Sequence, residues 1–557
     1  MEVQSRRVGL GDLRQEAPMA IDLRARMAVF GAVLLCMFLA SLDQTVVGTS
    51  LPRIVTDLQG SDRYTWVVTA YLLTSTVTIP VYGKFSDVYG RKAMLLVGVG
   101  LFLIGSWLSG LSQTMNQLIA FRALQGLGAG ALMPVAMATI GDLFTPRERG
   151  RYMGLFGAVF GISFLVGPFV GGWLTDNISW HWVFYVNVPV GLTALAALAT
   201  LLPNRRLEAS RARDLDYLGV AVFVAAVVPL LIGLTYKGEV NTSTGQLYNW
   251  TDANVGGLIG LGGILLLIFV VVEMRAAQPI IPLDLFKNRD YAVSMTAVFL
   301  FGVAMFTAVI FMPRFYQTVR GVSATTSGYY IWPILLGLMG GSIGTGQLIS
   351  RFGRYKWIIS GSAVVLLVGA FLMTHLRADT NDWMLWLWML VLGLGIGPSM
   401  AGFTTVVQSF VPMHRLGVAS STLTFLRQIG ASMGLAIAGT VFSSAFQSEL
   451  PTSLHGQGVT QPLIDVLMKQ AGVLQGVGNR AGLLAHVLPA RAHPLIPQIL
   501  SGVNDAFAKS TGMVFWIALA AGGAALVVSL AIRDLELKQD RPGMAAKLAQ
   551  GESTSVQ

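Results

Sequence analysis

The chain has 557 residues, of which 54% are hydrophobic and only 12% are charged, and its mean hydropathy is +0.64. This composition excludes a water-soluble protein of this length and indicates an all-α polytopic membrane protein. The formal net charge of +10 fits basic loops that lie against an anionic leaflet, so nucleic acid is not expected as a partner. The single cysteine, Cys36, excludes an internal disulfide.

Apolar runs of about 20 residues, the length that crosses a bilayer as a helix, recur along the whole chain. We predict fourteen spans, with edges good to several residues. They lie near 28–50, 64–83, 93–112, 116–140, 150–175, 182–203, 215–236, 253–273, 291–313, 323–350, 357–376, 383–411, 417–446 and 511–532.

An even number of spans places both termini on one side of the membrane. Most Lys and Arg residues fall in the inner segments when the termini are cytoplasmic, which predicts a multi-pass protein of the cytoplasmic membrane in that orientation. The first span lacks a cleavage pattern, so we expect it to be retained. The predicted parts are a cytoplasmic segment (1–26), a six-helix bundle (27–204), two inserted helices with linkers (205–290), a second six-helix bundle with outer loop 448–510 (291–532), and a disordered cytoplasmic tail (533–557).

Two charges inside apolar spans lie at the same predicted depth. Asp43 is about seven residues from the outer end of the first span, and Arg122 is six residues into the fourth, so both lie roughly 10 Å below the outer edge. Charges in hydrocarbon are costly and usually have a partner or face a cavity. A carboxylate that balances burial against a nearby guanidinium can take up and release protons. The alternative is a purely structural ion pair.

The loop after the second span contains Gly83, Asp87, Gly90 and Arg91. It joins two membrane helices and follows no strand, so it is not a phosphate-binding loop. We expect Asp87 to bind helix-end amides and Arg91 to reach Asp142, which closes the fourth span at the same depth. Such a cluster would act as a gate. The alternative is an ordinary basic cytoplasmic loop.

The fifth span combines close packing with a bend. Gly167 and Gly171 let a neighbouring helix approach, and Pro168 removes a backbone hydrogen bond. These residues predict a hinge-like seam.

Five stretches resemble the signature motifs of the major facilitator superfamily and, within it, of the fourteen-spanner drug/proton antiporter family. They are Leu42-Asp43-x-Thr45-Val46-Val47 with Leu51-Pro52, Trp66-x-x-Thr69-Ala70-Tyr71-x-Leu73, Gly83-x-x-x-Asp87-x-x-Gly90-Arg91-Lys92, Arg122-x-x-Gln125-Gly126-x-Gly128, and Gly167-Pro168-x-x-Gly171-Gly172. Gly48 and Ser50 depart from the family, which usually has Asn and Ala there. The resemblance implies two six-helix bundles plus two inserted helices, and a proton gradient in place of a cofactor.

An internal repeat supports two related halves. The glycines of the fourth span recur at one constant separation: Gly126, Gly128 and Gly130 as Gly393, Gly395 and Gly397. Met389 stands where Arg122 would recur, which concentrates proton handling in the first half. Arg427, near the midplane of the thirteenth span, is a further proton-coupling candidate. It either pairs with Asp43 when the halves close or binds backbone carbonyls.

Asp43 is the one deep carboxylate, which favours lipophilic monocations or neutral compounds as substrates. Aromatic rings, which can hold cations on their faces, and two glutamines are our candidates for the cavity wall. They are Tyr71, Gln125, Phe164, Trp332 and Gln428.

The outer loop 448–510 has apolar residues at helical spacing, so we expect amphipathic helices there. A plain cap on the carrier is the first interpretation; shielding of a lipid-facing exit or docking of a partner are the others. Its histidines, His455, His486 and His493, have no Cys or carboxylate cluster beside them, so no metal site is expected.

The leading functional hypothesis is proton-coupled efflux of lipophilic drug-like compounds by alternating access. An exporter of a lipid or another hydrophobic metabolite is the alternative. A membrane enzyme or a receptor is a remote one, because nucleophile elbows, metal-ligand clusters and phosphate loops are absent from suitable contexts.

Overall fold

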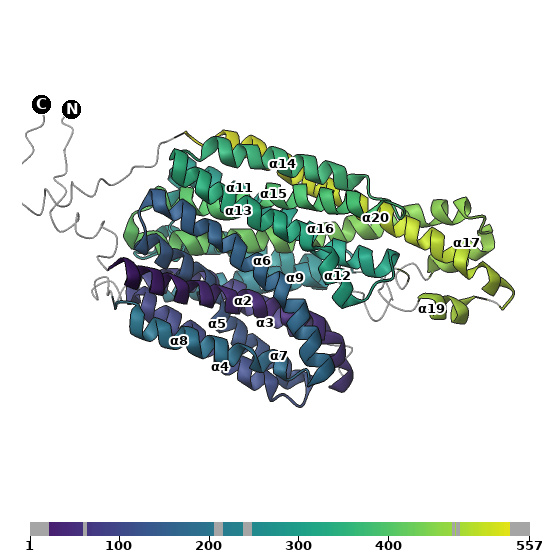
Figure 1. The fold of residues 1–557 in the computed structure, drawn as a ribbon, viewed down its shortest axis with the longest axis horizontal. Coiled ribbons are helices and arrows are strands. Elements are labelled where there is room, and N and C mark those ends of the chain that lie inside the picture. The colour runs from purple at the N-terminus through teal and green to yellow at the C-terminus, as the bar shows by residue number, and fades with distance from the viewer. Residues whose placement is uncertain are drawn as a thin grey trace, which may run out of the picture.

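The computed structural model describes residues 22–58, 64–204, 216–237, 248–469, 474, 480–488 and 490–534. The predictions for residues 1–21, for the basic loop 205–215 and for the tail beyond 534 lie outside these ranges. Every regular element in the described part is helical (Figure 1). The first part of the chain forms α2 (Leu23–Asp57), α3 (Tyr64–Tyr89), α4 (Arg91–Gly110), α5 (Met115–Leu143), α6 (Pro146–Asn177), α7 (Trp182–Tyr185) and α8 (Asn187–Leu201).

Two inserted helices and a second bundle follow. The inserted pair comprises α9 (Tyr217–Lys237) and η3 (Ala253–Gly257) continued by α10 (Leu258–Arg275). After the short η4 (Leu283–Lys287) come α11 (Arg289–Val319), α12 (Ala324–Tyr330), α13 (Trp332–Phe352), α14 (Lys356–Thr374), α15 (Asp382–Ser409), η5 (Met413–Arg415), α16 (Leu416–Gly456), α17 (Gln461–Lys469), α19 (Arg480–Val487), η6 (Ala490–Leu495) and α20 (Ile496–Leu530).

Thirteen helices in the described ranges are long and apolar enough to cross a membrane. They match thirteen of the fourteen predicted spans. The other predicted span, 323–350, is broken at Ile331 into α12 and α13. At 21 residues α13 is slightly longer than α14, which has 19, but its many glycines lower its hydropathy.

The helices lie side by side in two groups, with the two described ends of the chain at the same end of the bundle (Figure 1). We call this end the terminal end and the opposite one the cap end. The groups meet where α6 packs on α13 and where α3 packs on α16. The insert helix α9 lies over the second of these seams, because it contacts both α3 and α16.

The repeated glycines have the same role in both halves, because they allow close packing of neighbouring helices. Gly126 and Gly128 bring α5 against α3 and α4, since a Cβ there would lie 2.4 Å from the Tyr71 carbonyl oxygen and 2.3 Å from the Phe102 nitrogen. Gly393 and Gly395 bring α15 against α13 and α14 in the same way.

The cap end is formed by two helices that are longer than the membrane is thick. α16 has 41 residues and α20 has 35, so at 1.5 Å per residue they are about 60 Å and 50 Å long, against roughly 30 Å of hydrocarbon. The predicted spans 417–446 and 511–532 lie along these longer helices. Between these helices α17, α19 and η6 fold back, and their apolar faces form a cluster with Phe446, Leu450 and Phe507 (Figure 1).

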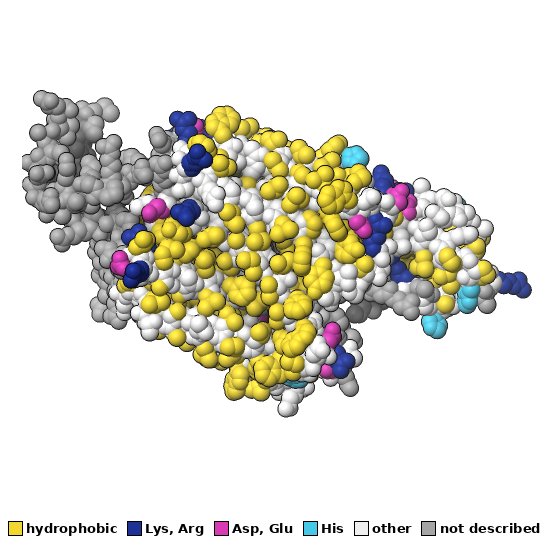
Figure 2. Space-filling model, viewed as in Figure 1, with side chains coloured by type: hydrophobic (Ala, Val, Ile, Leu, Met, Phe, Trp, Pro, Cys, Tyr) yellow, Lys and Arg dark blue, Asp and Glu magenta, His cyan; other side chains and the backbone are white. Residues whose placement is uncertain are grey.

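The visible outer surface is apolar along the middle of the bundle, while its charged side chains gather toward the two ends (Figure 2). This distribution fits a belt in contact with lipid. The predicted boundaries between segments of the chain stay predictions.

Candidate functional site

The two charges at matching depth form a buried ion pair. Nη1 of Arg122 on α5 donates to Oδ2 of Asp43 on α2 at 2.7 Å. Asp43 is 0% and Arg122 1% exposed. Removing one partner of such a pair costs about 3–5 kcal/mol, because the other charge is left uncompensated. The pair therefore links α2 to α5.

Two amides complete the surroundings of the Asp43 carboxylate. Nε2 of Gln125 donates to Oδ1 at 2.8 Å, and Nδ2 of Asn187 on α8 donates to the same oxygen at 2.9 Å. Oε1 of Gln125 in turn accepts from Nη1 of Arg122 at 2.8 Å. Both carboxylate oxygens thus face donors, so a proton arriving on Asp43 would displace at least one of these bonds.

Asn187 is absent from the residues predicted from the sequence. The break between α7 and α8 at Val186 places it at the start of α8, where Nδ2 also lies 3.1 Å from Oγ of Ser106. Asn187 lies five residues into the sixth predicted span from its outer end. The depth argument that paired Asp43 with Arg122 could therefore have found it.

Aromatic rings shield the ion pair. The guanidinium carbon of Arg122 lies 4.2 Å from the ring centroid of Tyr71 and 5.9 Å from that of Phe184. Tyr71, predicted as part of a cavity wall, is buried and stacks on the arginine instead. Low polarity around the pair strengthens its attraction.

Arg427 has a different environment. It is 9% exposed on α16, and in the described part of the chain no carboxylate pairs with it. Its Nη2 atom has no hydrogen-bond partner. The structure thus brings Asp43 to Arg122 and not to Arg427.

At the terminal end, Asp87 joins the two bundles. Its Oδ1 accepts from the backbone N–H of Gly417 at 2.9 Å and its Oδ2 from that of Val418 at 2.8 Å. These amides lie in the first turn of α16, where N–H groups lack helical partners and the helix dipole favours an anion. A Cβ at Gly83 would lie 1.9 Å from Oγ of Ser421. The bundles are therefore in direct contact at this end.

Arg91 ties this contact to the rest of the first bundle. Its guanidinium lies 2.5 Å from Asp87 and 2.9 Å from Asp142, as the sequence predicts, and donates to Oγ of Ser86 at 2.7 Å. Gly90, at φ +94°, begins α4 in a conformation that favours glycine. The predicted gate residues form one buried cluster.

Two further residues join the bundles at the same end and were missed. Nε2 of Gln408 on α15 donates to the carbonyl of Met137 at 3.0 Å, and Nη1 of Arg149 on α6 donates to the carbonyl of Gln408 at 3.1 Å. Nothing in the local sequence distinguishes them from ordinary loop-end residues, because their partners are backbone carbonyls of distant helices.

The glycines of α6 face α2. A Cβ at Gly167 would lie 1.9 Å from Oγ1 of Thr45, and one at Gly171 would lie 2.3 Å from Oγ1 of Thr49. Ser50, a departure from the family pattern, donates to the Gly171 carbonyl at 3.2 Å. Pro168 contacts α12, where a Cβ at Gly328 would lie 3.3 Å away.

Two of the five candidates for a cavity wall, Tyr71 and Gln125, meet at Arg122, and the other three lie elsewhere. Trp332, 37% exposed, lines an apolar pocket of about 500 Å³ with Phe169 and Tyr329. The rings of Phe164 and Phe160 are tilted to each other, with centroids 4.6 Å apart, and Gln428 is half-buried on α16. Gln125 belongs to the Asp43 site.

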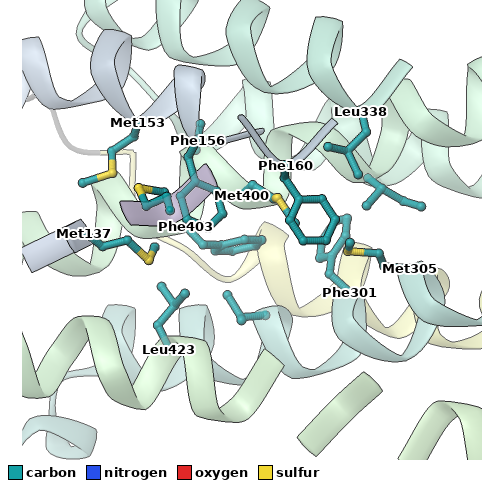
Figure 3. Close-up of a cluster of buried hydrophobic side chains, with 14 of the residues drawn as sticks. Met137, Met153, Phe156, Phe160, Phe301, Met305, Leu338, Met400, Phe403 and Leu423 are labelled. Carbon is teal, nitrogen blue, oxygen red and sulfur yellow. The ribbon is translucent and has the colours of Figure 1, made fainter. Parts of the chain in front are cut away.

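The centre, where the bundles face each other, is instead filled by methionine and phenylalanine side chains (Figure 3). All are less than 9% exposed, and they come from both bundles. They include Met137, Met153, Phe156 and Phe160 from the first bundle and Phe301, Met305, Leu338, Met400, Phe403 and Leu423 from the second. Below we call this group the Met/Phe centre. In the described residues no group of His, Cys, Asp and Glu could hold a metal.

These features define an all-α polytopic membrane protein with two helix bundles that meet at a packed centre. The family model "Major Facilitator Superfamily" matches residues 33–435, and the chain belongs to this superfamily. It is therefore a transporter rather than an enzyme by family, and the predicted fold is confirmed.

Two relatives from Bacillus subtilis (strain 168) bear names of drug exporters. The Multidrug transporter protein MdtP is 34% identical over 93% of this chain and 94% of its own, and Multidrug resistance protein 3 is 35% identical over 87% and 91%. The proton:xylose symporter XylE has the same fold, with a TM-score of 0.58 and 14% identity over 93% of this chain and 98% of its own.

Proposed function

We propose that the protein exports lipophilic compounds from the cytoplasm in exchange for protons, by alternating access. The observation that carries this proposal is the Asp43 carboxylate, which is fully buried and held by donors from Arg122, Gln125 and Asn187. A group of this kind, placed between helices that must move, can couple its protonation to their separation.

In this proposal the terminal end faces the cytoplasm, so the contacts of Asp87 with Gly417 and Val418 close the cytoplasmic side. A proton that reaches Asp43 from outside neutralises the carboxylate and removes its attraction to Arg122. The loss of that link frees α2 from α5 and favours substrate release and the return of the carrier. Release of the proton to the cytoplasm restores the pair.

The energy of one proton is sufficient for useful export. A potential of 100 mV and a difference of one pH unit together supply about 3.7 kcal/mol. That energy supports roughly a 500-fold concentration gradient of a neutral substrate at one proton per molecule. Exchange of a monocation for one proton moves no net charge, so only the pH part of about 1.4 kcal/mol remains, which supports roughly a tenfold gradient.

The Met/Phe centre supports the choice of substrate class. Methionine is flexible and polarisable, so a methionine-rich surface adapts to ligands of different shape. Phenylalanine rings add apolar area and accept cations on their faces. Lipophilic monocations and neutral aromatic compounds suit this wall better than hydrophilic solutes do. The names of the two Bacillus relatives agree with this class.

The test is substrate-dependent proton movement in proteoliposomes with an internal pH dye. A panel of lipophilic cations, neutral drugs and lipids is added one at a time under an imposed gradient. Proton flux with the drugs but not the lipids supports the proposal. Flux with lipids alone would identify the alternative, an exporter of lipids or other hydrophobic metabolites. If none of the compounds produced proton flux, proton coupling would be contradicted.

A further inference from the structure

The cap contains a buried arginine whose charge is not balanced. Arg480 on α19 is 8% exposed. Its guanidinium carbon lies 5.3 Å from the ring centroid of Phe507, and Nη1 donates to Oδ1 of Asn504 at 3.3 Å, the long end of a hydrogen bond. Among the described residues, Nε and Nη2 are buried without a hydrogen-bond partner. Buried guanidinium groups in native proteins are normally paired, so these two donors indicate a missing acceptor.

A second arginine shares the same ring. The guanidinium carbon of Arg314 on α11 lies 5.7 Å from the ring centroid of Phe507 and 4.9 Å from that of Phe442. Burial and the positive charge of Arg314 lower the pKa of Arg480 to about 10. Two like charges beside one ring repel each other and together attract an anion.

The acidic side chains of the cap do not neutralise Arg480. Glu449 and Asp505 pair with Lys509 at 3.7 Å and 2.8 Å. Asp465 accepts from Gln461 at 2.8 Å. Among the described residues, no ion pair is left for Arg480.

We propose that Arg480, together with Arg314, Asn504 and Phe507, binds the anionic head group of an amphiphile, a phosphate or a carboxylate. The guanidinium fork suits both groups, because two parallel N–H donors match two oxygens.

The depth of the site agrees with this ligand. Arg314 lies within the last two turns of α11 (Arg289–Val319) at the cap end, where a spanning helix reaches the head-group region of a bilayer. Two sources of the head group fit: a membrane phospholipid, or a single-chain amphiphile that leaves the carrier. The site does not depend on proton coupling at Asp43.

The experiment measures binding to the purified full-length protein in an uncharged maltoside detergent. The probes are dodecyl phosphate, phosphatidylglycerol and inorganic phosphate, and the variants are Arg480→Gln and, as matched control, Arg491→Gln, an exposed arginine of the same cap. We expect at least tenfold weaker binding of the amphiphile to Arg480→Gln and unchanged binding to Arg491→Gln. Equal affinity for wild type and Arg480→Gln, or no binding of any anionic amphiphile, overturns the proposal.

The probes separate the sources of the head group. Binding of phosphatidylglycerol without dodecyl phosphate assigns the site to a membrane lipid, and binding of dodecyl phosphate assigns it to a single-chain amphiphile. Inorganic phosphate that binds as tightly as either shows that the head group alone is recognised.

Thermal unfolding distinguishes a ligand site from a structural arginine. Without ligand we expect Arg480→Gln to unfold at or above the wild-type temperature, because an uncompensated buried charge has been removed. Dodecyl phosphate should raise the unfolding temperature of the wild type and of Arg491→Gln but not of Arg480→Gln. A lower unfolding temperature for Arg480→Gln, with an unchanged shift by the amphiphile, contradicts the site. Arg314→Gln repeats the measurement if Arg480→Gln does not fold.

Discussion

Oδ1 of Asp87 accepts a hydrogen bond from the backbone nitrogen of Gly417 at 2.9 Å, across 330 positions of the sequence. A carboxylate of the first bundle thus caps the first turn of a helix of the second. Because Arg91 also binds this carboxylate, the contact between Asp87 and α16 is connected to Asp142 and the rest of the first bundle. Opening of the terminal end must break this contact.

Substitution of Asp87 by Ala should therefore favour the open terminal end. The closed state loses hydrogen bonds to a charged group, each worth about 1.5–3 kcal/mol, so the ratio of closed to open molecules should fall more than tenfold. Tyr89 and Phe352 are both exposed at this end. With spin labels on Tyr89→Cys and Phe352→Cys, pulsed electron paramagnetic resonance should report a longer distance between the two labels. The native Cys36 is fully buried and does not interfere.

The control for this measurement is Asp57→Asn, an exposed carboxylate at the cap end of α2 that pairs with Arg53 of the same helix at 3.3 Å. Its distance distribution should match that of the wild type. If Asp87→Ala also matched the wild type, the Asp87 contact would not hold the two bundles together.

A pair of glycine substitutions tests the same closure by packing alone. Gly83→Ala places a methyl group against Ser421 and Gly417, so it should also lengthen the label distance. Gly100→Ala on α4 is the matched control, because a Cβ there meets nothing within 4 Å. An unaltered label distance in Gly83→Ala would show that the contact between α3 and α16 can accommodate the added methyl group without separation of the helices.

The sequence offered Arg122 as a partner of Asp43, with Arg427 as the alternative, because depth in a membrane can be counted along a helix. Burial of each charge in hydrocarbon costs free energy, so each charge needs a partner. Each lies a known number of residues from the end of its span, and two charges at the same depth in different spans can meet. The Arg91–Asp142 contact followed from the same reasoning. In both cases a charge in an apolar environment restricts the choice of partner.

The remaining features depend on information that the local sequence lacks. The break that splits the tenth predicted span at Ile331 is the exception, because Pro333 in the first turn of α13 is a local signal for it. The extension of α16 past the predicted end of its span depends on distant partners, since its residues Leu450 and Leu454 pack in the cap cluster. Gln408 and Arg149 bind carbonyls of distant helices. The Met/Phe centre was missed since apolar side chains inside apolar spans look alike until the helices are placed.

Asn187→Ala tests the amide that the sequence analysis missed. Loss of its hydrogen bond to Asp43 destabilises the ionised carboxylate relative to the protonated one, so half-maximal transport should move to higher pH by about one unit, given about 1.5 kcal/mol for such a bond. The measurement is the initial rate of drug efflux as a function of external pH. Asn177→Ala, an exposed asparagine, should leave the profile in place; an unshifted profile for Asn187→Ala would remove Asn187 from the site.

Phe403→Leu tests the Met/Phe centre. Phe403 is fully buried, and its ring lies 5.6 Å from that of Phe301 between the two bundles. The smaller side chain should change the ratio of transport efficiencies for an aromatic cation and a neutral aliphatic compound several-fold, since it removes an aromatic face but keeps apolar volume. The pH profile should stay as in the wild type. Equal effects on all substrates would indicate a general packing defect.

The central claim is that Asp43 carries the proton. Asp43→Asn keeps the size of the side chain and much of its hydrogen bonding but removes the titratable group. In proteoliposomes with an imposed proton gradient, we predict that this variant loses uphill, proton-coupled drug transport while Asp57→Asn retains it. Substrate binding, measured by fluorescence quenching, should change less than threefold. Full proton-coupled transport by Asp43→Asn would contradict the account.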